Sequence, residues 1–236
     1  MIRIETGMAL AAGLGTRMRP LTLTRPKALI DVGGRALLDH VLDRFVDAGV
    51  CDAVVNIHHL ANLMRDHLNA RSGAPELHIS DESAQVLETG GGLVKARPLL
   101  GNDPVFISNI DAIWRDGETP ELDRLRAAWD GREMDALLLL ARRDDTLGYN
   151  GAGDFFLEEN GQVRRRGSSD SAPFVFAGTQ ILNPAVIDGY PENAFSLNRI
   201  WDSLLKQGRV HGVVMEAFWM HVGDPDARDA AEARMK

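Results

Sequence analysis

The sequence contains a single cysteine, Cys51, among its 236 residues, so it has no disulfide framework and fits a reducing compartment. It also lacks any apolar run of about 18 residues, the length that a membrane-spanning helix needs. Its first residues, MIRIETGMALAAG, lack the basic and then apolar stretches of a signal peptide. We therefore expect a cytoplasmic protein that does not enter a membrane.

The sequence also has fewer basic than acidic residues. The 26 lysines and arginines are outnumbered by 34 aspartates and glutamates, which gives a formal net charge of −8. Nucleic acid is therefore not expected as a partner, because binding to it depends on neutralising phosphates with a basic surface. The segment from Leu10 to Leu29 is an exception, since it holds three arginines, one lysine and no acid. A local basic patch of this kind suits a compact anionic ligand.

Short apolar segments alternate with segments of helical spacing along most of the chain. Strands are predicted at 8–13, 52–57, 76–80, 104–111, 135–143 and 173–182, and helices at 36–50, 60–70, 91–100, 121–131 and 199–208. This order indicates an α/β fold with a mostly parallel sheet and helices on both faces. A small hairpin is predicted at 154–167, and the late strands 209–215 and 217–223 are expected to pair with each other.

In an open parallel sheet, ligands bind beyond the carboxyl ends of the strands. Three unusual segments follow predicted strands, namely Gly13–Arg19, Asp111 and His221. The glycines allow backbone N–H groups to approach an anion, and Arg17 adds charge, so the first segment suits phosphate binding; the alternative is a flexible turn with solvated arginines. Its pattern, Gly-x-Gly-x-x-Met, departs from the dinucleotide fingerprint and argues against an oxidoreductase.

The segment LAAGLGTRMRPLTLTRPKALIDVGGRALLDH, from Leu10 to His40, resembles the N-terminal signature of sugar-1-phosphate nucleotidylyltransferases. Only the last proline of that signature is missing, because Ala36 stands in its place. The resemblance implies a Rossmann-like, GT-A-like three-layer α/β/α fold with a mostly parallel sheet and a small C-terminal β-hairpin. It also implies that the glycine loop holds the nucleotide phosphates, that Arg17 stabilises the pyrophosphate leaving group and that Lys27 contacts the attacked α-phosphate.

Later segments are similar to bacterial N-acetylmuramate-1-phosphate uridylyltransferases. They are LETGGGLVKARPLLGNDPVFISNID at 87–111, GAGDF at 151–155, FVFAGTQILNP at 174–184, AFSL at 194–197 and FWMHVGDPDA at 218–227. The resemblance implies transfer of a nucleotidyl group from UTP to N-acetylmuramate-1-phosphate, for peptidoglycan recycling. Guanylyltransferases for mannose-1-phosphate or heptose-1-phosphate share many of these motifs and are the alternative; a non-catalytic nucleotide-sugar sensor is a third possibility.

The sequence has no internal repeat, linker or low-complexity tract, which indicates one continuous domain. We expect one domain over 1–236, with a nucleotide-binding portion at 1–150 and a sugar-binding portion at 151–236. The partners would be two small molecules, an NTP and a sugar-1-phosphate, and the protein would be a monomer or a homodimer.

Binding residues follow from the same resemblance. Those implied for the nucleotide are Leu10, Ala11, Ala12, Gly13, Gly15, Thr16 and Glu82, and those for the sugar are Glu88, Thr89, Gly90, Asn109, Asp154 and Gly178. Glu82 could accept the N–H groups of uracil or guanine, or it could be a solvated loop residue. The run RRRG, Arg164–Gly167, could clamp the lactyl carboxylate of muramate, although such a run is more typical of a solvated face.

A divalent metal is implied by Asp111, which follows an apolar strand and could hold Mg²⁺; the alternative is a cap at the strand end. His221 stands where related enzymes have aspartate as the second metal ligand. Imidazole suits Mn²⁺ better than Mg²⁺, so His221 could shift the metal preference. Otherwise Asp224 reaches the metal, Asp111 and the phosphates hold it alone, or His221 only caps a carbonyl.

Overall fold

The computed structural model of the protein describes residues 2–236. Its strands are β1 (Thr6–Leu10), β2 (Asp31–Val32), β3 (Arg35–Ala36), β4 (Asp52–Ile57), β5 (Glu76–Asp81), β6 (Val105–Asn109), β7 (Ala112–Ile113), β8 (Ala136–Arg142), β9 (Thr146–Leu147), β10 (Phe155–Leu157), β11 (Val163–Arg165), β12 (Phe174–Leu182), β13 (Val210–Val214) and β14 (Trp219–His221). Its α-helices are α1 (Leu37–Asp47), α2 (Ala61–Ala70), α3 (Glu88–Ala96), α4 (Glu121–Ala128), α5 (Asn198–Lys206) and α6 (Pro225–Met235).

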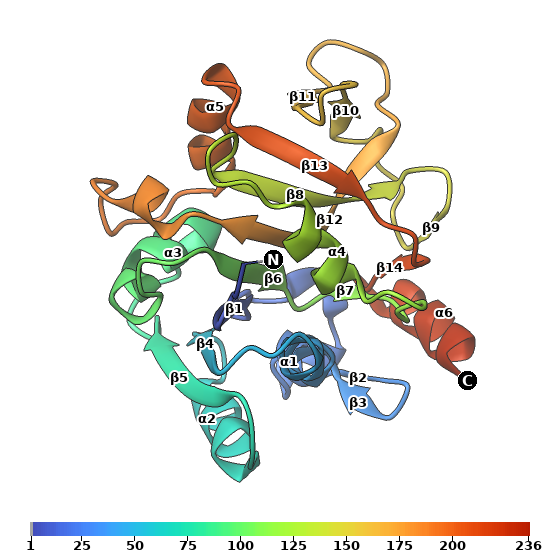
Figure 1. The fold of residues 1–236 in the computed structure, drawn as a ribbon. Coiled ribbons are helices and arrows are strands. Elements are labelled where there is room, and N and C mark those ends of the chain that lie inside the picture. Colours follow the sequence, from blue (N-terminus) through green and yellow to red (C-terminus); the bar gives the residue numbers. More distant parts are fainter. Residues whose placement is uncertain (1) are drawn as a thin grey trace.

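The central sheet crosses the whole molecule in the order β5, β4, β1, β6, β12, β8, β13 (Figure 1). Strands β5, β4, β1 and β6 are mutually parallel, and β13 is parallel to β8. Of these seven strands, only β12 runs in the opposite direction, antiparallel to both β6 and β8. The predicted mostly parallel α/β sheet is therefore confirmed, and the carboxyl ends of β1, β4 and β6 lie at one edge.

Helices cover both faces of this sheet, because each helix has an apolar stripe that must be buried. Leu38 of α1, Met64 of α2 and Leu125 of α4 belong to one hydrophobic cluster. Leu93 of α3 and Ile200 of α5 belong to the other. The predicted three-layer arrangement is confirmed. No helix within residues 2–236 combines the length and the apolar composition needed to cross a bilayer.

The predicted hairpin at 154–167 is confirmed as the antiparallel pair β10 and β11. It joins the sheet through β10, where Phe155 pairs with Phe174 at the start of β12. In Figure 1 it lies beyond the edge of the sheet where β13 is found. The hairpin is positioned to form one wall of a cavity against α5.

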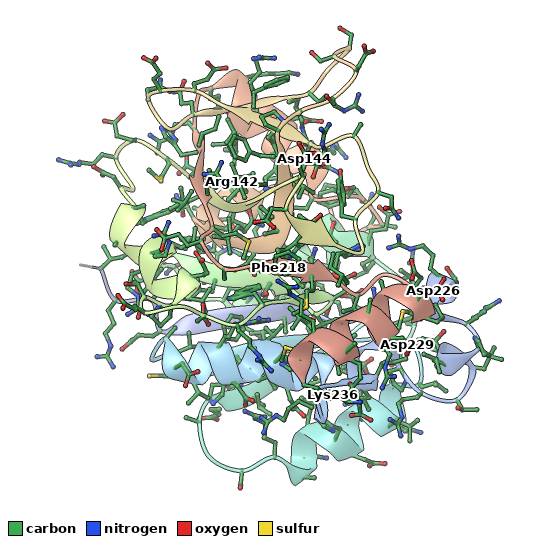
Figure 2. All side chains as sticks on the ribbon, turned by 90° about the vertical axis from the view of Figure 1, so that its right-hand side faces the viewer. Arg142, Asp144, Phe218, Asp226, Asp229 and Lys236 are labelled. Carbon is green, nitrogen blue, oxygen red and sulfur yellow. The ribbon has the colours of Figure 1, made fainter. Side chains whose placement is uncertain are left out.

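The expected pairing of the two late strands is wrong. Strand β13 extends the sheet beside β8, and β14 joins β7 and β9 in a separate three-stranded sheet. The cause is that β13 pairs with the free apolar edge of β8. The chain after β13 then crosses to the end of β6, where β14 pairs with β7. Helix α6, which the sequence analysis did not predict, follows β14; Asp224 caps it, and its alanines Ala227 and Ala231 are buried. Figure 2 shows α6 between Asp226 and Lys236, on the flank of the molecule.

Candidate functional site

Two cavities meet at the carboxyl edge of the sheet. One, of about 310 Å³, lies over the loop after β1 and is called here the loop-side cavity. The other, of about 400 Å³, lies against the hairpin and α5 and is called here the hairpin-side cavity. Arg17, Asn109 and Asp111 line both. Arg17 and Asp111 are 94 residues apart in the sequence. The cationic glycine loop and the carboxylate at the end of β6 therefore share one cleft.

The loop after β1 is held by a side chain that the sequence analysis missed. Asn56, near the end of β4, is 2% exposed, and its Oδ1 accepts hydrogen bonds from the backbone N–H groups of Ala11 at 2.6 Å and Ala12 at 3.2 Å. Its Nδ2 donates to Oε1 of Glu82 at 2.7 Å. The sequence did contain a signal for this role, because Asn56 is an amide inside the apolar strand VVNI. A polar group buried in such a strand needs hydrogen-bond partners.

Glu82 is a buried part of the cavity wall, which excludes the alternative of a solvated loop residue. It is 1% exposed, and its Oε2 accepts from the backbone N–H of Leu87 at 3.3 Å. Burial raises the pKa of Glu82 above its ordinary value, although the hydrogen bonds from Asn56 and Leu87 oppose this. Both carboxylate oxygens therefore support the cavity wall, and a contact with the base stays a prediction.

The two loop glycines differ in what they permit. Gly15 has a φ of 61°, and a Cβ there would lie 2.9 Å from Cβ of Lys27 and from Cγ2 of Thr22. A side chain at Gly15 would therefore be strained and would displace the lysine. At Gly13, by contrast, a Cβ would meet nothing within 4 Å. Gly13 thus leaves open space above its backbone, which a ligand could approach.

Two cations stand at the junction of the cavities. Nζ of Lys27 lies 2.6 Å from Oδ2 of Asp111. Burial by itself raises the pKa of Asp111, but Lys27 and His221 outweigh burial and hold that pKa well below its ordinary value. Arg17 is exposed, and within residues 2–236 no carboxylate pairs with it. Arg17 is therefore a cation that remains free for a ligand.

The residues expected to bind a metal converge on one point. Nδ1 of His221 lies 3.3 Å from the carbonyl oxygen of Gly148, and Nε2 lies 3.5 Å from Oδ2 of Asp111. Without a cation, Nε2–H donates to Asp111; in the tautomer that donates Nδ1–H to Gly148, the lone pair of Nε2 would be available to a cation shared with the carboxylate. Oδ1 of Asp224, the alternative ligand, is already used to cap α6, where it accepts from the N–H of Ala227 at 2.8 Å.

This donor set fits a divalent ion that also takes oxygens from a substrate. One carboxylate and one imidazole are too few to hold Mg²⁺ alone, and no cluster of three or more histidine, cysteine, aspartate or glutamate ligands occurs within residues 2–236. Mg²⁺ commonly uses one or two carboxylates together with phosphate oxygens and water. A nitrogen ligand from His221 would favour Mn²⁺ more than a set made only of oxygens does.

The hairpin-side cavity receives three of the residues implied for the sugar. Asn109, at the end of β6, has an amide that forms no hydrogen bond within the described chain. Asp154 lines the cavity, and its Oδ2 accepts from the N–H of Phe176 at 3.0 Å. Gly178, with a φ of 85°, lies in the irregular part of β12, and a Cβ there would meet Ala112 at 2.9 Å.

The other three residues implied for the sugar lie elsewhere. Glu88 and Thr89 line the loop-side cavity, and Glu88 has a left-handed φ of 57°, a conformation that costs about 1–2 kcal/mol in a residue with a side chain. Gly90 lines neither cavity: its N–H donates to the carbonyl of Phe195 at 2.8 Å, and a Cβ there would collide with the Phe195 ring. The structure therefore corrects Gly90 from a ligand contact to a packing position.

Comparison with known proteins gives consistent results. Residues 7–179 match the family described as the MobA-like NTP transferase domain. The chain is 51% identical over 234 residues to the N-acetylmuramate alpha-1-phosphate uridylyltransferase of Caulobacter vibrioides, covering 98% of this chain and 97% of that one. It is 33% identical to the protein of the same name from Neisseria meningitidis, covering 92% of each. A more distant relative, at 28% identity, is the mannose-1-phosphate guanylyltransferase catalytic subunit beta of Dictyostelium discoideum, of which 61% is covered.

Among solved structures, HddC from Yersinia pseudotuberculosis, complexed with GMP-PN, has the same fold. The TM-score is 0.79, and the match covers 99% of this chain and 100% of that one at 22% sequence identity. At this identity the likeness establishes the nucleotidyltransferase fold alone.

Proposed function

The chain belongs to the MobA-like NTP transferase family and is a sugar-1-phosphate nucleotidylyltransferase, and on that premise we propose that it transfers a uridylyl group from UTP to N-acetylmuramate 1-phosphate. The observation that carries this proposal is the meeting of the two cavities at Arg17, Asn109 and Asp111. A nucleotide in the loop-side cavity and a sugar phosphate in the hairpin-side cavity would place their phosphates at that junction.

The reaction joins two anions, so the chain must supply positive charge and alignment. An oxygen of the sugar phosphate attacks the α-phosphorus of UTP, a new P–O bond forms, and the bond to pyrophosphate breaks on the opposite side. Lys27 stands beside Asp111 to neutralise charge at the junction, and the unpaired Arg17 is available to the departing pyrophosphate. No general base is needed, because a phosphate monoester is already an oxyanion near neutral pH.

We also propose that Asp111 and His221 hold a divalent ion, Mg²⁺ with Mn²⁺ as a substitute. When bound, such an ion would supply positive charge that stabilises the negative charge developing on the phosphates. Asp111 supplies the oxygen ligand, and Gly148 orients the His221 ring through Nδ1. Replacing His221 with alanine should reduce activity more with Mn²⁺ than with Mg²⁺, because only the softer ion gains from the imidazole.

A specific observation supports a second candidate, guanylyl transfer to mannose 1-phosphate. A glutamate can accept from the N–H groups of guanine as well as from uracil, and Glu82 lines the loop-side cavity. However, the relative with 51% identity is named for uridylyl transfer to N-acetylmuramate phosphate, which favours the first candidate.

The deciding experiment is a substrate matrix. UTP, GTP, CTP and dTTP are each combined with N-acetylmuramate, N-acetylglucosamine, mannose or heptose 1-phosphate, and pyrophosphate release is measured with Mg²⁺ and with Mn²⁺. We expect UTP with N-acetylmuramate 1-phosphate to give the highest kcat/KM. A higher value for GTP with mannose 1-phosphate would overturn the proposal, and the absence of turnover with every pair would favour a nucleotide-sugar sensor.

The biological setting follows from the proposed substrate. A protein with this activity would return cell-wall sugar to UDP-N-acetylmuramate in the cytoplasm, as part of peptidoglycan recycling. Its partners would be the two small substrates, and we propose a monomer or a homodimer. Light scattering of the purified protein measures the oligomeric state directly.

A further inference from the structure

The hairpin-side cavity contains a cation that the reaction itself does not use. Arg165, the last residue of β11, lines this cavity on the wall formed by the hairpin and α5. Arg17 is the other arginine that lines it, at the junction with the loop-side cavity. Asp111 follows β6, which pairs with the last residues of β12, whereas the hairpin pairs with the first residue of β12. The cavity therefore has positive charge on two different walls.

The three arginines of the run RRRG have different surroundings, because side chains alternate along a strand. Nε of Arg164 lies 3.2 Å from Oε1 of Glu158, and its guanidinium lies over the Phe156 ring, outside the cavity. Arg166 donates to the carbonyl groups of Gly153 and Ser169 and so ties down its own loop. Only Arg165 reaches the cavity.

The guanidinium of Arg165 is held in place along one side. Nε and Nη2 donate to Oδ1 of Asp202 at 3.1 and 2.9 Å, and Nη2 donates to Oδ1 of Asn198 at 2.8 Å. The group lies 5.0 Å from the ring centre of Phe155 and 5.6 Å from that of Trp201. Within residues 2–236, Nη1 has no hydrogen-bond partner. The guanidinium of Arg165 is thus fixed in position, and its Nη1 remains available as a hydrogen-bond donor.

The charge around Arg165 leaves it able to attract an anion. Asp202 does not line the hairpin-side cavity but borders a separate surface hollow, and its side chain is 56% exposed to water. Asp154 is the other acidic side chain in this cavity besides Asp111, and one of its oxygens already accepts from Phe176. An exposed ion pair is weak, so its partner does not cancel the attraction of Arg165 for a second carboxylate.

We propose that Arg165 binds the carboxylate of an acidic sugar phosphate and thereby selects N-acetylmuramate 1-phosphate over N-acetylglucosamine 1-phosphate. This inference rests on the proposed function. The two sugars differ by one lactyl ether at O3, two ring positions away from the phosphate at C1, and this lactyl group carries a carboxylate. With the phosphate at the junction near Arg17, the lactyl group points to a different wall, and a guanidinium fork is the group best suited to a carboxylate.

The test compares two substrates and two neighbouring arginines. Arg165→Gln should lower kcat/KM for N-acetylmuramate 1-phosphate with UTP by about 30-fold, in line with loss of one charge-assisted hydrogen-bonding group. The value for N-acetylglucosamine 1-phosphate, or its KI where it is not turned over, should change less than about twofold, since that sugar has no carboxylate. Arg165→Lys should restore part of the loss, and Arg164→Gln should leave both values unchanged. Tm and the Kd for UTP report whether each variant is folded.

Each remaining outcome is decisive. Equal losses with both sugars would show that Arg165 only supports the wall, and no loss with the acidic sugar would show that its carboxylate binds elsewhere; either result overturns this inference and leaves the proposed function intact. If the wild-type protein prefers GTP and mannose 1-phosphate, the proposed function and this inference both fail. The substrate matrix on the wild-type protein therefore separates the two failures.

Discussion

The loop-side and hairpin-side cavities are built in different ways. The loop-side cavity takes a large share of its lining from one contiguous segment, Leu10–Arg17, whose backbone is fixed by Asn56. The hairpin-side cavity is formed by one to three residues from each of several separate elements, β6, β7, β10, β11, β12, α5 and β14. Backbone groups bind what all nucleoside triphosphates share, whereas dispersed side chains can be exchanged one at a time. We infer that the first cavity serves the reaction common to the family and that the second sets which sugar is used.

The largest effect on turnover should come from a substitution at the junction, whose residues line both cavities. Lys27→Met should lower kcat about 10³-fold with every sugar phosphate, because charge at the reacting phosphates is no longer neutralised. It should also destabilise the fold by about 2 kcal/mol, since Asp111 loses its 2.6 Å partner. Pyrophosphate release and urea unfolding measure the two effects.

The control for this variant is Lys27→Met combined with Asp111→Asn. Removing the unpaired carboxylate should recover part of the stability without recovering turnover. If Lys27→Met alone kept its kcat within about tenfold of the wild-type value, the placement of the reaction at this junction would be wrong.

The next effect sharpens the comparison on the loop side. Asn56→Ala leaves two backbone N–H groups and one oxygen of Glu82 buried without partners, so we expect a loss of about 3 kcal/mol in the free energy of unfolding. KM for UTP should rise about tenfold, while KM for the sugar phosphate stays within about twofold. Chemical denaturation and steady-state kinetics measure these quantities.

A matched control is available at Asn183, which caps a short turn and donates to Asp135 at 2.9 Å, away from both cavities. Asn183→Ala should destabilise the protein without changing either KM. An equal rise in both KM values for Asn56→Ala would mean that the loop is not specific to the nucleotide.

A smaller effect separates the glycines of the two sides. Gly13→Ala meets open space, so stability should change by less than about 1 kcal/mol, but the new methyl group should raise KM for UTP several-fold. Gly178→Ala has a φ of 85° and a close contact with Ala112, so it should lose about 2 kcal/mol of stability and raise KM for the sugar phosphate. Thermal unfolding and kinetics of the two variants distinguish these cases. A normal KM for UTP in Gly13→Ala would show that the nucleotide does not approach this backbone.

The smallest effect tests whether the two sides unfold together. Burial lowers the pKa of His40 in α1 and that of His211 in β13. Both histidines are therefore less protonated in the folded than in the unfolded protein, so stability should fall as the pH drops below about 6.5, the ordinary histidine value. The loss between pH 7.5 and pH 5.5 should be smaller than that of Asn56→Ala. His40→Gln and His211→Gln should each make stability less dependent on pH. Unfolding should occur in a single transition that fluorescence and circular dichroism report alike. Two separate unfolding transitions would show that the two sides of the molecule unfold independently.

The different construction of the two cavities also explains which site residues could be predicted from the sequence. The loop from Leu10 to Lys27 is contiguous, so its glycines, cations and prolines could be interpreted together without knowing the fold. Asp111 was recognisable because it follows an apolar strand. The late strands β13 and β14 were assigned to the wrong partners, because their apolar patterns do not specify which strand edge is free.

The sequence by itself determined the main strands and helices up to α5, the basic glycine loop and the membership in a nucleotidyltransferase family, because these depend on local patterns and contiguous motifs. Only the tertiary structure decided that Asn56 holds the loop, that the imidazole of His221 faces Asp111, and that Arg165 rather than Arg164 or Arg166 lines a cavity. Each of these depends on strand register and on contacts between residues far apart in the chain. A shift of one residue in the hairpin register would turn Arg165 away from the cavity.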